Sequence, residues 1–594
     1  MKRFFLVSVL LGWAVFAQAG PLKTYCNPIN IDYGYTPIPN FAVQGKHRAT
    51  ADPVIALFKG NYYLFSTNQW GYWWSENMLN WNFVPRKFLK PGANVFDELC
   101  APAVWVMDNA LYVVGSTYSK DFAIWKSSDP RTDNWTVAVA SFQAGAWDPA
   151  FFLDDDGRLY LYHGSSNLHP LLGMEIDRKT LQPTGSDTPL VNLHDDIHGW
   201  ERFGESCDNT FLPPFIEGSW MNKHEGKYYL QYAAPGTEFS GYGDGVYVGD
   251  HPLGSFTYQA HNPFSFKPGG FARGAGHGAT FQDKFGNWWH VSTITLCVKN
   301  NFERRIGIWP AGFDKDGILN VNTAYGDYPT YLPDAGEWRV KGRFAGWMLL
   351  NNKKPVRVSS TYGSFNANNA VDEDMKTYWS AASGDKGEWL ESDLGSVSEI
   401  RAVQINFADQ DVEFMGKSLG VSHRYKLYTS RDGLNWELIV DKSTNKTDVP
   451  HEYVELQNPV KARMVKIENI GMPTGKFALS GFRVFGLGSG EKPGMVKNFA
   501  VLRGFTDNRN AWLKWQVSDH ATGYVIYSGI APDKLYTSVM VYGVNEYYFR
   551  AMDRDRVYYF QIEAFNENGI SERSPAMKAE IQLRPPDRPA PRTE

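Results

Sequence analysis

Five copies of one short pattern, between about residues 45 and 320, constrain the fold of this chain more than any other feature. Each copy has a small or polar residue at a strand start, an apolar strand, a turn that usually contains Gly, and a second strand with aromatic side chains. The copies begin at Asp52, Ala101, Asp148, Glu217 and His277. Each is the signature of a β-hairpin. Five such hairpins, each followed by further strand-like segments, predict a five-bladed β-propeller with four-stranded blades rather than a sandwich.

The same repeat brings titratable side chains together. The leading residue precedes the turn Gly by eight residues at Asp52, and by nine at Asp148, Glu217 and His277. The innermost strands of a propeller line its central channel, so equivalent strand starts converge on the axis. We therefore expect Asp52, Asp148, Glu217 and His277 to meet in one pocket.

Several separated motifs over about residues 22–335 resemble glycoside hydrolase family 43. They are Ala51-Asp52-Pro53 with Tyr62-Tyr63-Leu64, Ser75 to Trp81, Ala101-Pro102, Trp147-Asp148-Pro149, and Glu217-Gly218 with Tyr228-Tyr229-Leu230. The chain departs from the family pattern at Cys100, where a Trp is usual, and at Ser219, where a Pro is common. The resemblance implies an inverting glycosidase in which Asp52 is the general base, Glu217 the general acid, and Asp148 the residue that orients the acid and raises its pKa.

This set of carboxyls suits the chemistry. Hydrolysis with inversion needs one carboxyl to protonate the leaving oxygen and a second to activate water on the opposite face. A third carboxylate near the acid keeps it protonated by like-charge repulsion. A lone Asp before Pro is more often a turn residue, but three carboxyls in register favour catalysis. Glu201, Glu205 and Glu238 are rival acids that lie outside the repeat position.

Four further side chains are candidates for substrate binding. By resemblance, His277 lies beneath the substrate, holding water or a metal such as calcium, and Arg304 contacts the substrate or Asp148. The alternatives are a hydrogen-bonded core histidine and a surface arginine. Trp147 and Trp74 are candidates for stacking on sugar rings, although most propeller tryptophans belong to the core.

The acidic run Asp154-Asp155-Asp156-Gly157 looks like a metal loop. Its position at a hairpin tip, away from the channel mouth, favours a solvated turn instead.

Residues 351–487 resemble a discoidin-type, coagulation factor 5/8 C-type domain, similar to carbohydrate-binding module family 32, with a jelly-roll β-sandwich fold. The resemblance rests on Asn369 to Trp379 and on the hairpin Tyr428 to Trp436. It implies a structural Ca²⁺ near Asp372, Asp374 and Thr377, whose oxygens suit a hard cation. An acidic turn is the alternative.

Residues 495–583 follow a Gly-rich linker and resemble a fibronectin type III sandwich, with Tyr558 placed like a tyrosine corner. Such domains are usually spacers. The Pro-rich tail, residues 584–594, is predicted to be disordered.

Composition and the first residues bear on partners and location. The net charge of −5 and the lack of a Lys/Arg-rich run argue against nucleic acid. Four cysteines without CxxC spacing are expected to be mostly buried thiols. Lys2 and Arg3, an apolar run and Ala17-Gln18-Ala19 predict a signal peptide over residues 1–19. No apolar stretch reaches the length of a transmembrane helix. We expect a monomer exported to the periplasm or outside the cell.

The sequence thus predicts an all-β, exported glycosidase that needs no cofactor for its chemistry and acts on oligo- or polysaccharides. The family implies arabinofuranose, xylose, galactofuranose or galactan linkages, and α-L-arabinofuranosidase is the first choice. The competing hypothesis is a catalytically inactive, glycan-binding propeller protein, because fold does not guarantee function.

Overall fold

The computed structural model describes residues 22–35, 47–67, 70–85, 99–116, 122–332, 343–413 and 422–582. The predicted signal peptide and the predicted disordered tail lie outside the described residues. The described part is almost entirely β-structure, with three short 3₁₀ turns, η1 (Pro130–Thr132), η2 (Gly199–Glu201) and η3 (Ala367–Ala370). It contains no helix long and apolar enough to span a membrane.

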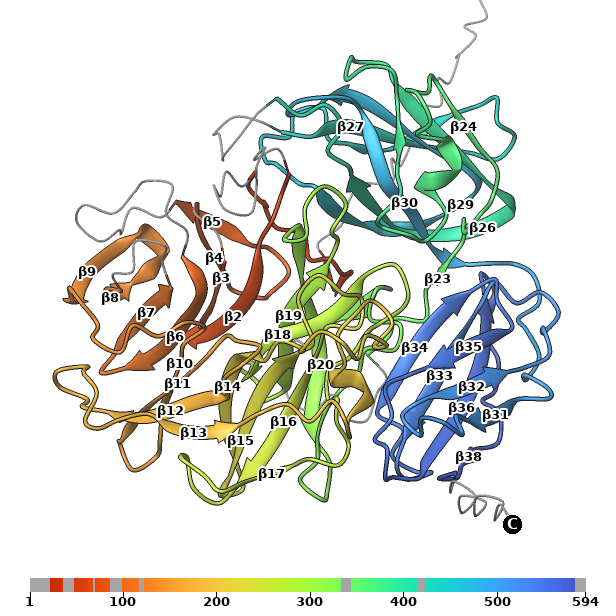
Figure 1. Ribbon diagram of the computed structural model, residues 1–594. Coiled ribbons are helices and arrows are strands. Elements are labelled where there is room, and N and C mark those ends of the chain that lie inside the picture. Colours follow the sequence, from red (N-terminus) through yellow and green to blue (C-terminus); the bar gives the residue numbers. More distant parts are fainter. Residues whose placement is uncertain are drawn as a thin grey trace, which may run out of the picture.

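The first half of the described chain forms five antiparallel sheets of four strands each, and in every sheet the strands follow chain order (Figure 1). The first is β2 (Ala51–Phe58), β3 (Asn61–Thr67), β4 (Gly71–Ser75) and β5 (Asn82–Pro85). The second is β6 (Cys100–Met107), β7 (Ala110–Ser116), β8 (Ile124–Asp129) and β9 (Asn134–Val139). The third is β10 (Ala150–Leu153), β11 (Leu159–His163), β12 (Leu171–Ile176) and β13 (Thr188–Val191). The fourth is β14 (Glu217–His224), β15 (Lys227–Ala234), β16 (Gly243–Gly249) and β17 (Phe256–Tyr258). The fifth is β18 (Arg273–Gln282), β19 (Trp288–Thr295), β20 (Arg304–Phe313) and β21 (Leu319–Val321).

These sheets are the blades of a propeller. The first strand of each blade contacts the first strand of the next, and β18 contacts β2, which closes the ring. The N-terminal segment adds to this closure, because Asn27 exchanges two hydrogen bonds with the backbone of Ile308 in β20, at 3.0 Å each. Strand β1 (Thr24–Tyr25) also pairs with β22 (Thr330–Tyr331), at the other end of the propeller sequence.

A jelly-roll sandwich follows the propeller. Its strands are β23 (Met348–Leu349), β24 (Val356–Val358), β25 (Trp379–Ser380), β26 (Trp389–Phe407), β27 (Arg424–Ser430), β28 (Glu437–Asp441), β29 (His451–Gly471) and β30 (Ala478–Leu487). The long strands β26 and β29 pair along most of their length, and residues from them fill a separate core with Trp379 and Phe482.

The last part of the described chain is a second sandwich. One sheet contains β31 (Ala500–Arg503), β32 (Ala511–Lys514) and β35 (Glu546–Phe549). The other contains β33 (Gly523–Gly529), β34 (Thr537–Tyr542), β36 (Tyr558–Asn566), β37 (Gly569–Ile570) and β38 (Met577–Ala579). Tyr558 begins β36, and its hydroxyl accepts a hydrogen bond from the Asp553 amide at 3.0 Å. This is the geometry of a tyrosine corner.

Both sandwiches pack directly against the propeller (Figure 1). Arg48 of the propeller forms buried ion pairs with Asp409 and Asp448 of the first sandwich, at 3.3 and 2.5 Å. His198, in the segment between the third and fourth blades, bonds to Asp553 of the second sandwich at 2.8 Å. The second sandwich and these two blades share one hydrophobic core. The expectation of a spacer is therefore wrong, because the second sandwich is docked on the propeller rather than set apart from it.

Candidate active site

The candidate site lies at one bend in each of the five inner strands or just before it, and each bend contains a residue with left-handed backbone geometry. The bend is near the start of β2, β6, β10 and β14, and in the middle of β18. The φ angles are 51° at Asp52, 39° at Ala101, 48° at Asp148, 65° at Gly218 and 44° at His277. In β2, β6, β14 and β18 the pairing register also shifts at this place. A bulge of this kind re-aims a side chain, and left-handed residues other than Gly cluster at functional sites.

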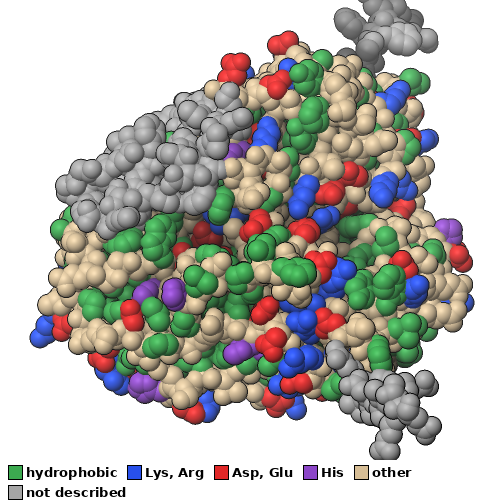
Figure 2. Space-filling view, viewed as in Figure 1, with side chains coloured by type: hydrophobic (Ala, Val, Ile, Leu, Met, Phe, Trp, Pro, Cys, Tyr) green, Lys and Arg blue, Asp and Glu red, His purple; other side chains and the backbone are tan. Residues whose placement is uncertain are grey.

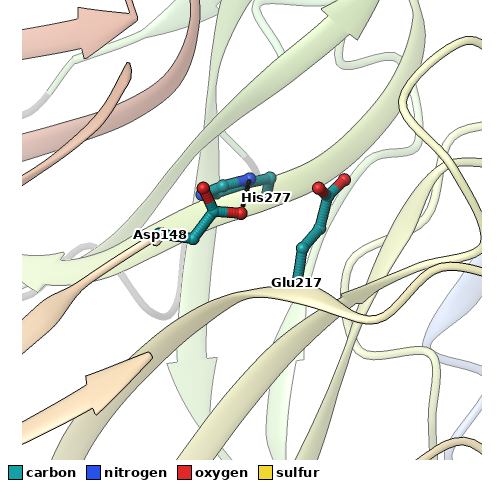
Figure 3. Close-up of side chains that lie close together, drawn as sticks. All are labelled: Asp148, Glu217 and His277. Carbon is teal, nitrogen blue, oxygen red and sulfur yellow. Dashed lines mark ion pairs between the residues drawn. The ribbon is translucent and has the colours of Figure 1, made fainter. Parts of the chain in front are cut away.

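The equivalence predicted from the repeat is correct for Asp52, Asp148 and His277 and wrong by one residue for Glu217. In the fourth blade the left-handed position is occupied by Gly218, so Glu217 stands one residue earlier. A bulge absorbs the difference, because the register shifts between Glu217 and Trp220. The four predicted side chains nevertheless share one site. His277 Nδ1 lies 3.3 Å from Asp52 Oδ1 and 3.9 Å from Asp148 Oδ2. Glu217 lies beside Asp148 and His277 (Figure 3).

Asp52 is held as an ionised carboxylate. Thr67 donates a hydrogen bond to its Oδ2 at 2.5 Å, and Arg304 donates to its Oδ1 at 3.3 Å. Its own amide donates to Thr293 Oγ1 at 2.9 Å. Burial alone would raise the pKa of Asp52, but Arg304, His277 and the two threonines outweigh it and lower the pKa. This residue is poised to accept a proton.

Asp148 and Glu217 are shifted the other way. Burial, with the charges of Glu217 and Asp52, raises the pKa of Asp148 to about 7 against the opposing effect of His277. Burial also raises the pKa of Glu217, although His277 and the Tyr242 hydrogen bond oppose it. One oxygen of each carboxyl lies within 4.8 Å of the other, so their protons leave as those of a coupled pair.

Glu217 is oriented by one side chain from its own blade, the fourth, and by one from the third blade. Tyr242 donates a hydrogen bond to Oε1 at 2.5 Å, and Ser165 donates to Oε2 at 3.3 Å. Tyr242 is fully buried, so the position of its hydroxyl is fixed by packing. Glu217 extends from β14 toward the space beside Asp148 and His277 (Figure 3).

His277 lies among these carboxyls, and their charges raise its pKa. Burial lowers its pKa, but Asp52, Asp148, Glu217 and Asp244 outweigh burial and raise it. Asp244 fixes the backbone at this point, accepting from the His277 amide at 2.7 Å.

Asp148, Glu217 and His277 each offer one ligand atom to a possible metal, within 4.8 Å of one another. A metal here would need the neutral imidazole of His277 and would therefore compete with its proton. A metal at this place stays a prediction, and no later step depends on it.

Of the remaining predicted substrate-binding residues, Arg304 and Trp147 lie at the site and Trp74 does not. Arg304 contacts Asp52 and donates to Thr237 Oγ1 at 3.1 Å, so its carboxylate partner is Asp52 rather than Asp148. Trp147 is 38% exposed next to Asp148, at the mouth of the site. Trp74 lies on β4, the third strand of its blade, where it packs on the hydrophobic core and the Arg131 guanidinium lies over its ring. It is placed as a core tryptophan, not as a residue of the site.

Two of the rival acids have structural partners. Glu201 is fully buried and accepts hydrogen bonds from Tyr232 and from the His194 amide. Glu205 accepts from the backbone and hydroxyl of Ser240 and lies 3.6 Å from Lys376 of the first sandwich.

The acidic run forms the turn between β10 and β11, as expected. Its Asp154 carboxylate accepts from Lys223 and from Tyr228, both at 2.6 Å. The four cysteines also follow expectation, since Cys26, Cys100 and Cys207 are buried and Cys297 is half-buried.

The predicted calcium loop of the first sandwich is a hydrogen-bonded turn. Thr377 donates to Asp372 Oδ2 at 2.6 Å, and the Asp374 amide donates to Asp372 Oδ1 at 2.9 Å. The Asp374 carboxylate lies 3.6 Å from the Arg273 guanidinium of the propeller. These oxygens turn to one another and to a cationic side chain, which is a poor fit for a cation cage. Calcium here stays a prediction, and no later step depends on it.

The repeat pattern did not identify the residues that orient the carboxyls. Thr67 and Thr293 lie at the ends of second strands, and Ser165 and Tyr242 lie in loops. Thr67 also accepts a hydrogen bond from the Ala101 amide at 2.7 Å, so it joins the first and second blades at the site. Thr67 and Thr293 could have been found from the sequence, because each lies near the end of the strand that pairs with an inner strand. Ser165 and Tyr242 lie in loops and gave no such signal.

Comparison with known proteins finds family matches in two parts of this chain. Residues 46–319 match the family model described as glycosyl hydrolases family 43, and residues 355–481 match that of the F5/8 type C domain. The chain is 34% identical over 134 residues to a beta-xylosidase of Xylanibacter ruminicola, which is 19% of this chain and 39% of that protein. It is 33% identical over 153 residues to an arabinoxylan arabinofuranohydrolase of Paenibacillus polymyxa, which is 24% of this chain and 22% of that protein. The chain thus spans about two fifths or less of the length of these curated relatives. A crystal structure of a thermostable family-43 glycoside hydrolase is 23% identical, covering 53% of this chain and 99% of that one with a TM-score of 0.42.

The family matches confirm the predicted glycosidase domain and the predicted discoidin-type domain; neither match extends to the second sandwich. Residues 46–319 form a glycosyl hydrolases family 43 domain, and residues 355–481 form an F5/8 type C domain.

Proposed function

We propose that the propeller is an inverting glycoside hydrolase. The observation that carries the proposal is the opposite direction of the pKa shifts at one site, lowered for Asp52 and raised for Asp148 and Glu217. Pairs of carboxyls whose environments push their pKa values apart identify the base and the acid.

In this mechanism Asp52 is the general base. Arg304 and Thr67 hold its carboxylate, so one oxygen is directed at the water that attacks the anomeric carbon. The base takes a proton from that water as the new C–O bond forms. His277 Nδ1 lies 3.3 Å from Asp52 Oδ1, where a protonated imidazole would offset the charge of the base.

Glu217 is the general acid. Its raised pKa keeps the proton that the leaving oxygen receives when the glycosidic bond breaks. Ser165 and Tyr242 hold the two oxygens of this carboxyl. Asp148 orients Glu217 and helps to keep it protonated, because two carboxyls this close do not both ionise readily.

For the substrate, we propose an α-L-arabinofuranosyl or β-xylosyl linkage, with α-L-arabinofuranosidase as the first choice. The support is the sequence resemblance together with the names of the two curated relatives, a beta-xylosidase and an arabinoxylan arabinofuranohydrolase. In the same proposal the F5/8 type C domain binds glycan and raises the local substrate concentration. Export as a monomer remains part of this proposal on the sequence alone.

We also propose that the second sandwich is a fibronectin type III domain. The support is its division into β31-β32-β35 and β34-β33-β36 with β38, together with the tyrosine corner at Tyr558.

The test is a product screen that includes two carboxyl variants. The wild-type protein is incubated with aryl α-L-arabinofuranosides, aryl β-xylosides and arabinoxylan, and NMR follows the anomer released. We expect one pentose with inverted configuration. On arabinoxylan, whose leaving sugar oxygen needs a proton, Asp52→Asn and Glu217→Gln should each lower kcat at least about 100-fold, because each removes a group that moves a proton.

Glu205→Gln is the matched control, since it changes a nearby acidic residue that is bound to Ser240 rather than to the site. It should retain wild-type turnover. Full hydrolysis by either Asp52→Asn or Glu217→Gln would show that the roles are misassigned. Glycan binding without turnover in the wild-type protein would favour the inactive, glycan-binding alternative.

A further inference from the structure

Four exposed apolar side chains lie on loops that lead into the candidate active site. Trp147 is 38% exposed, Leu168 74%, Phe211 95% and Leu212 53%. We call these four residues the rim patch. Single exposed apolar residues are normal on protein surfaces, but a group of them beside a functional site marks an interaction surface. Figure 2 shows groups of hydrophobic side chains between charged ones on the viewed face of the molecule.

The loops that carry the rim patch meet at Glu217. Ser165, three residues before Leu168, donates a hydrogen bond to Glu217 Oε2 at 3.3 Å. Ser166 and Ile216 exchange backbone hydrogen bonds of 3.0 and 2.9 Å, so the loop with Leu168 runs beside the loop that leads from Phe211 to Glu217.

The third loop joins the first through the backbone. The Trp147 carbonyl accepts a hydrogen bond from the Gly164 amide at 2.9 Å. Trp147 also directly precedes Asp148 in the chain. All four rim residues therefore lie within a few residues of the carboxyl pair that holds the proton for the leaving oxygen.

The two most exposed members are presented by closed turns. Asn209 Oδ1 accepts from the amides of Phe211 and Leu212, at 2.9 and 3.1 Å. Ser166 Oγ accepts from the amides of Leu168 and His169, at 2.9 and 3.1 Å. These turns fix the backbone before any ligand arrives, which reduces the ordering cost of binding.

The base and the acid stand on opposite sides of the site, and the loops of the rim patch belong to the side of the acid. The base Asp52 comes from the first blade and is held by the first and fifth blades, through Thr67, Thr293 and Arg304. The acid Glu217 comes from the fourth blade and is held by residues of the third and fourth. Water attacks from the side of the base, and the leaving group departs on the side of the acid.

We propose that the rim patch binds the sugar units beyond the bond that is cleaved, so that the substrate is a chain rather than a short glycoside. This inference rests on the proposed hydrolase function. The apolar faces of sugar rings pack against Phe211, Leu168 and Trp147, while the terminal sugar occupies the pocket of carboxyls. The leaving group is then a glycan chain that lies across the third and fourth blades.

The experiment compares two substrates that share a terminal sugar and differ in the leaving group. They are wheat arabinoxylan and methyl α-L-arabinofuranoside or, if the protein releases xylose, xylohexaose and methyl β-xyloside. Methanol is too small a leaving group to reach the rim patch. We expect Phe211→Ala to lower kcat/KM on the long substrate about tenfold and to leave kcat/KM on the methyl glycoside unchanged. Leu168→Ala should show the same split with a smaller factor.

Leu502→Ala is the matched control, because Leu502 is 65% exposed on the second sandwich, on strand β31. It should change neither value. An equal loss on both substrates, or no loss on either, overturns the proposal. If the wild-type protein cleaves none of the substrates, the proposed function fails. Calorimetric titration with xylohexaose then tests whether the rim patch binds glycan, independently of catalysis. Weaker binding by Phe211→Ala supports it, and equal binding overturns it.

Discussion

Replacing Arg48 by Met is expected to destabilise the joint between the propeller and the F5/8 type C domain severely. Arg48 is 1% exposed and binds Asp409 and Asp448 of that domain. It also donates to the Tyr33 carbonyl at 2.6 Å and to the Tyr35 hydroxyl at 2.7 Å. Methionine fills a similar volume but leaves two buried carboxylates without their guanidinium partner.

The expected cost is about 3–5 kcal/mol in the free energy of unfolding, the usual effect of removing one partner of a buried ion pair. Burial raises the pKa of Asp448, but Arg48 and His423 outweigh burial and lower it. Asp448 therefore stabilises the fold above the ordinary pKa of aspartate, and this contribution is lost as the pH falls through the lowered value. In Arg48→Met the buried carboxyls take up protons at higher pH, so the difference from wild type shrinks on acidification.

The assay is urea unfolding followed by tryptophan fluorescence, at neutral pH and at about pH 4. Arg463→Met is the control, since Arg463 and Asp393 form a pair whose side chains are 46% and 21% exposed. Exposed pairs contribute about 0–1 kcal/mol. If Arg48→Met costs no more than Arg463→Met at neutral pH, the buried network does not hold the two domains together and the reasoning is refuted.

Three further changes test other parts of the structure. Asp148→Asn removes a negative charge near Glu217, which should lower the pKa of Glu217 and move the alkaline limb of the kcat/KM pH profile to lower pH. An unchanged limb would show that Asp148 does not influence the pKa of Glu217. Burial lowers the pKa of His198, but the bond to Asp553 and nearby Glu201 outweigh burial and raise it. Docking of the second sandwich should therefore be strongest below about pH 6.5 and weaken as the pH rises through the raised pKa, and His198→Gln should abolish that trend in urea midpoints. Tyr558→Phe removes the hydrogen bond from the Asp553 amide and should lower the free energy of unfolding by about 1–2 kcal/mol. A smaller loss would show that the tyrosine corner does not stabilise the fold.

The propeller could be predicted from the sequence because each of its hairpins is specified by a short stretch of neighbouring residues. Alternating apolar residues and Gly-containing turns specify hairpins one at a time, and the inner strands of a propeller need only be similar to one another. The repeat therefore located the left-handed positions Asp52, Asp148 and His277 correctly, although His277 lies in the middle of β18 rather than at its start. The discoidin-type jelly roll was likewise predicted from short motifs within one domain.

Glu217 was identified although its register was misjudged, and the reason is physical. From Asp52 to Gly60 the chain passes a bulge, a five-residue ladder and a two-residue turn. Asp148 precedes its turn Gly by nine residues because β10 is shorter and its turn longer. Glu217 has the same offset for another reason, since it stands before the left-handed Gly218. Counting residues cannot separate a longer turn from an earlier start.

The docking of the three domains follows from no local pattern, because its partners lie hundreds of residues apart. Arg305 illustrates what docking does for the site. Its guanidinium donates to His451 of the F5/8 type C domain at 2.7 Å and to the Arg48 carbonyl at 2.6 Å. The neighbouring residue Arg304 is the one that binds Asp52.

The strand that brings a cation to the proposed base is thus clamped from outside the propeller. Excising residues 22–335 would leave Arg305, at the start of β20, and Arg48, before β2, without their partners in the F5/8 type C domain. A propeller without its first sandwich should then hold Asp52 less firmly, even where all three carboxyls are retained. The F5/8 type C domain accordingly supports the strand that carries Arg304, besides being a candidate for glycan binding, and activity is best measured on the full chain.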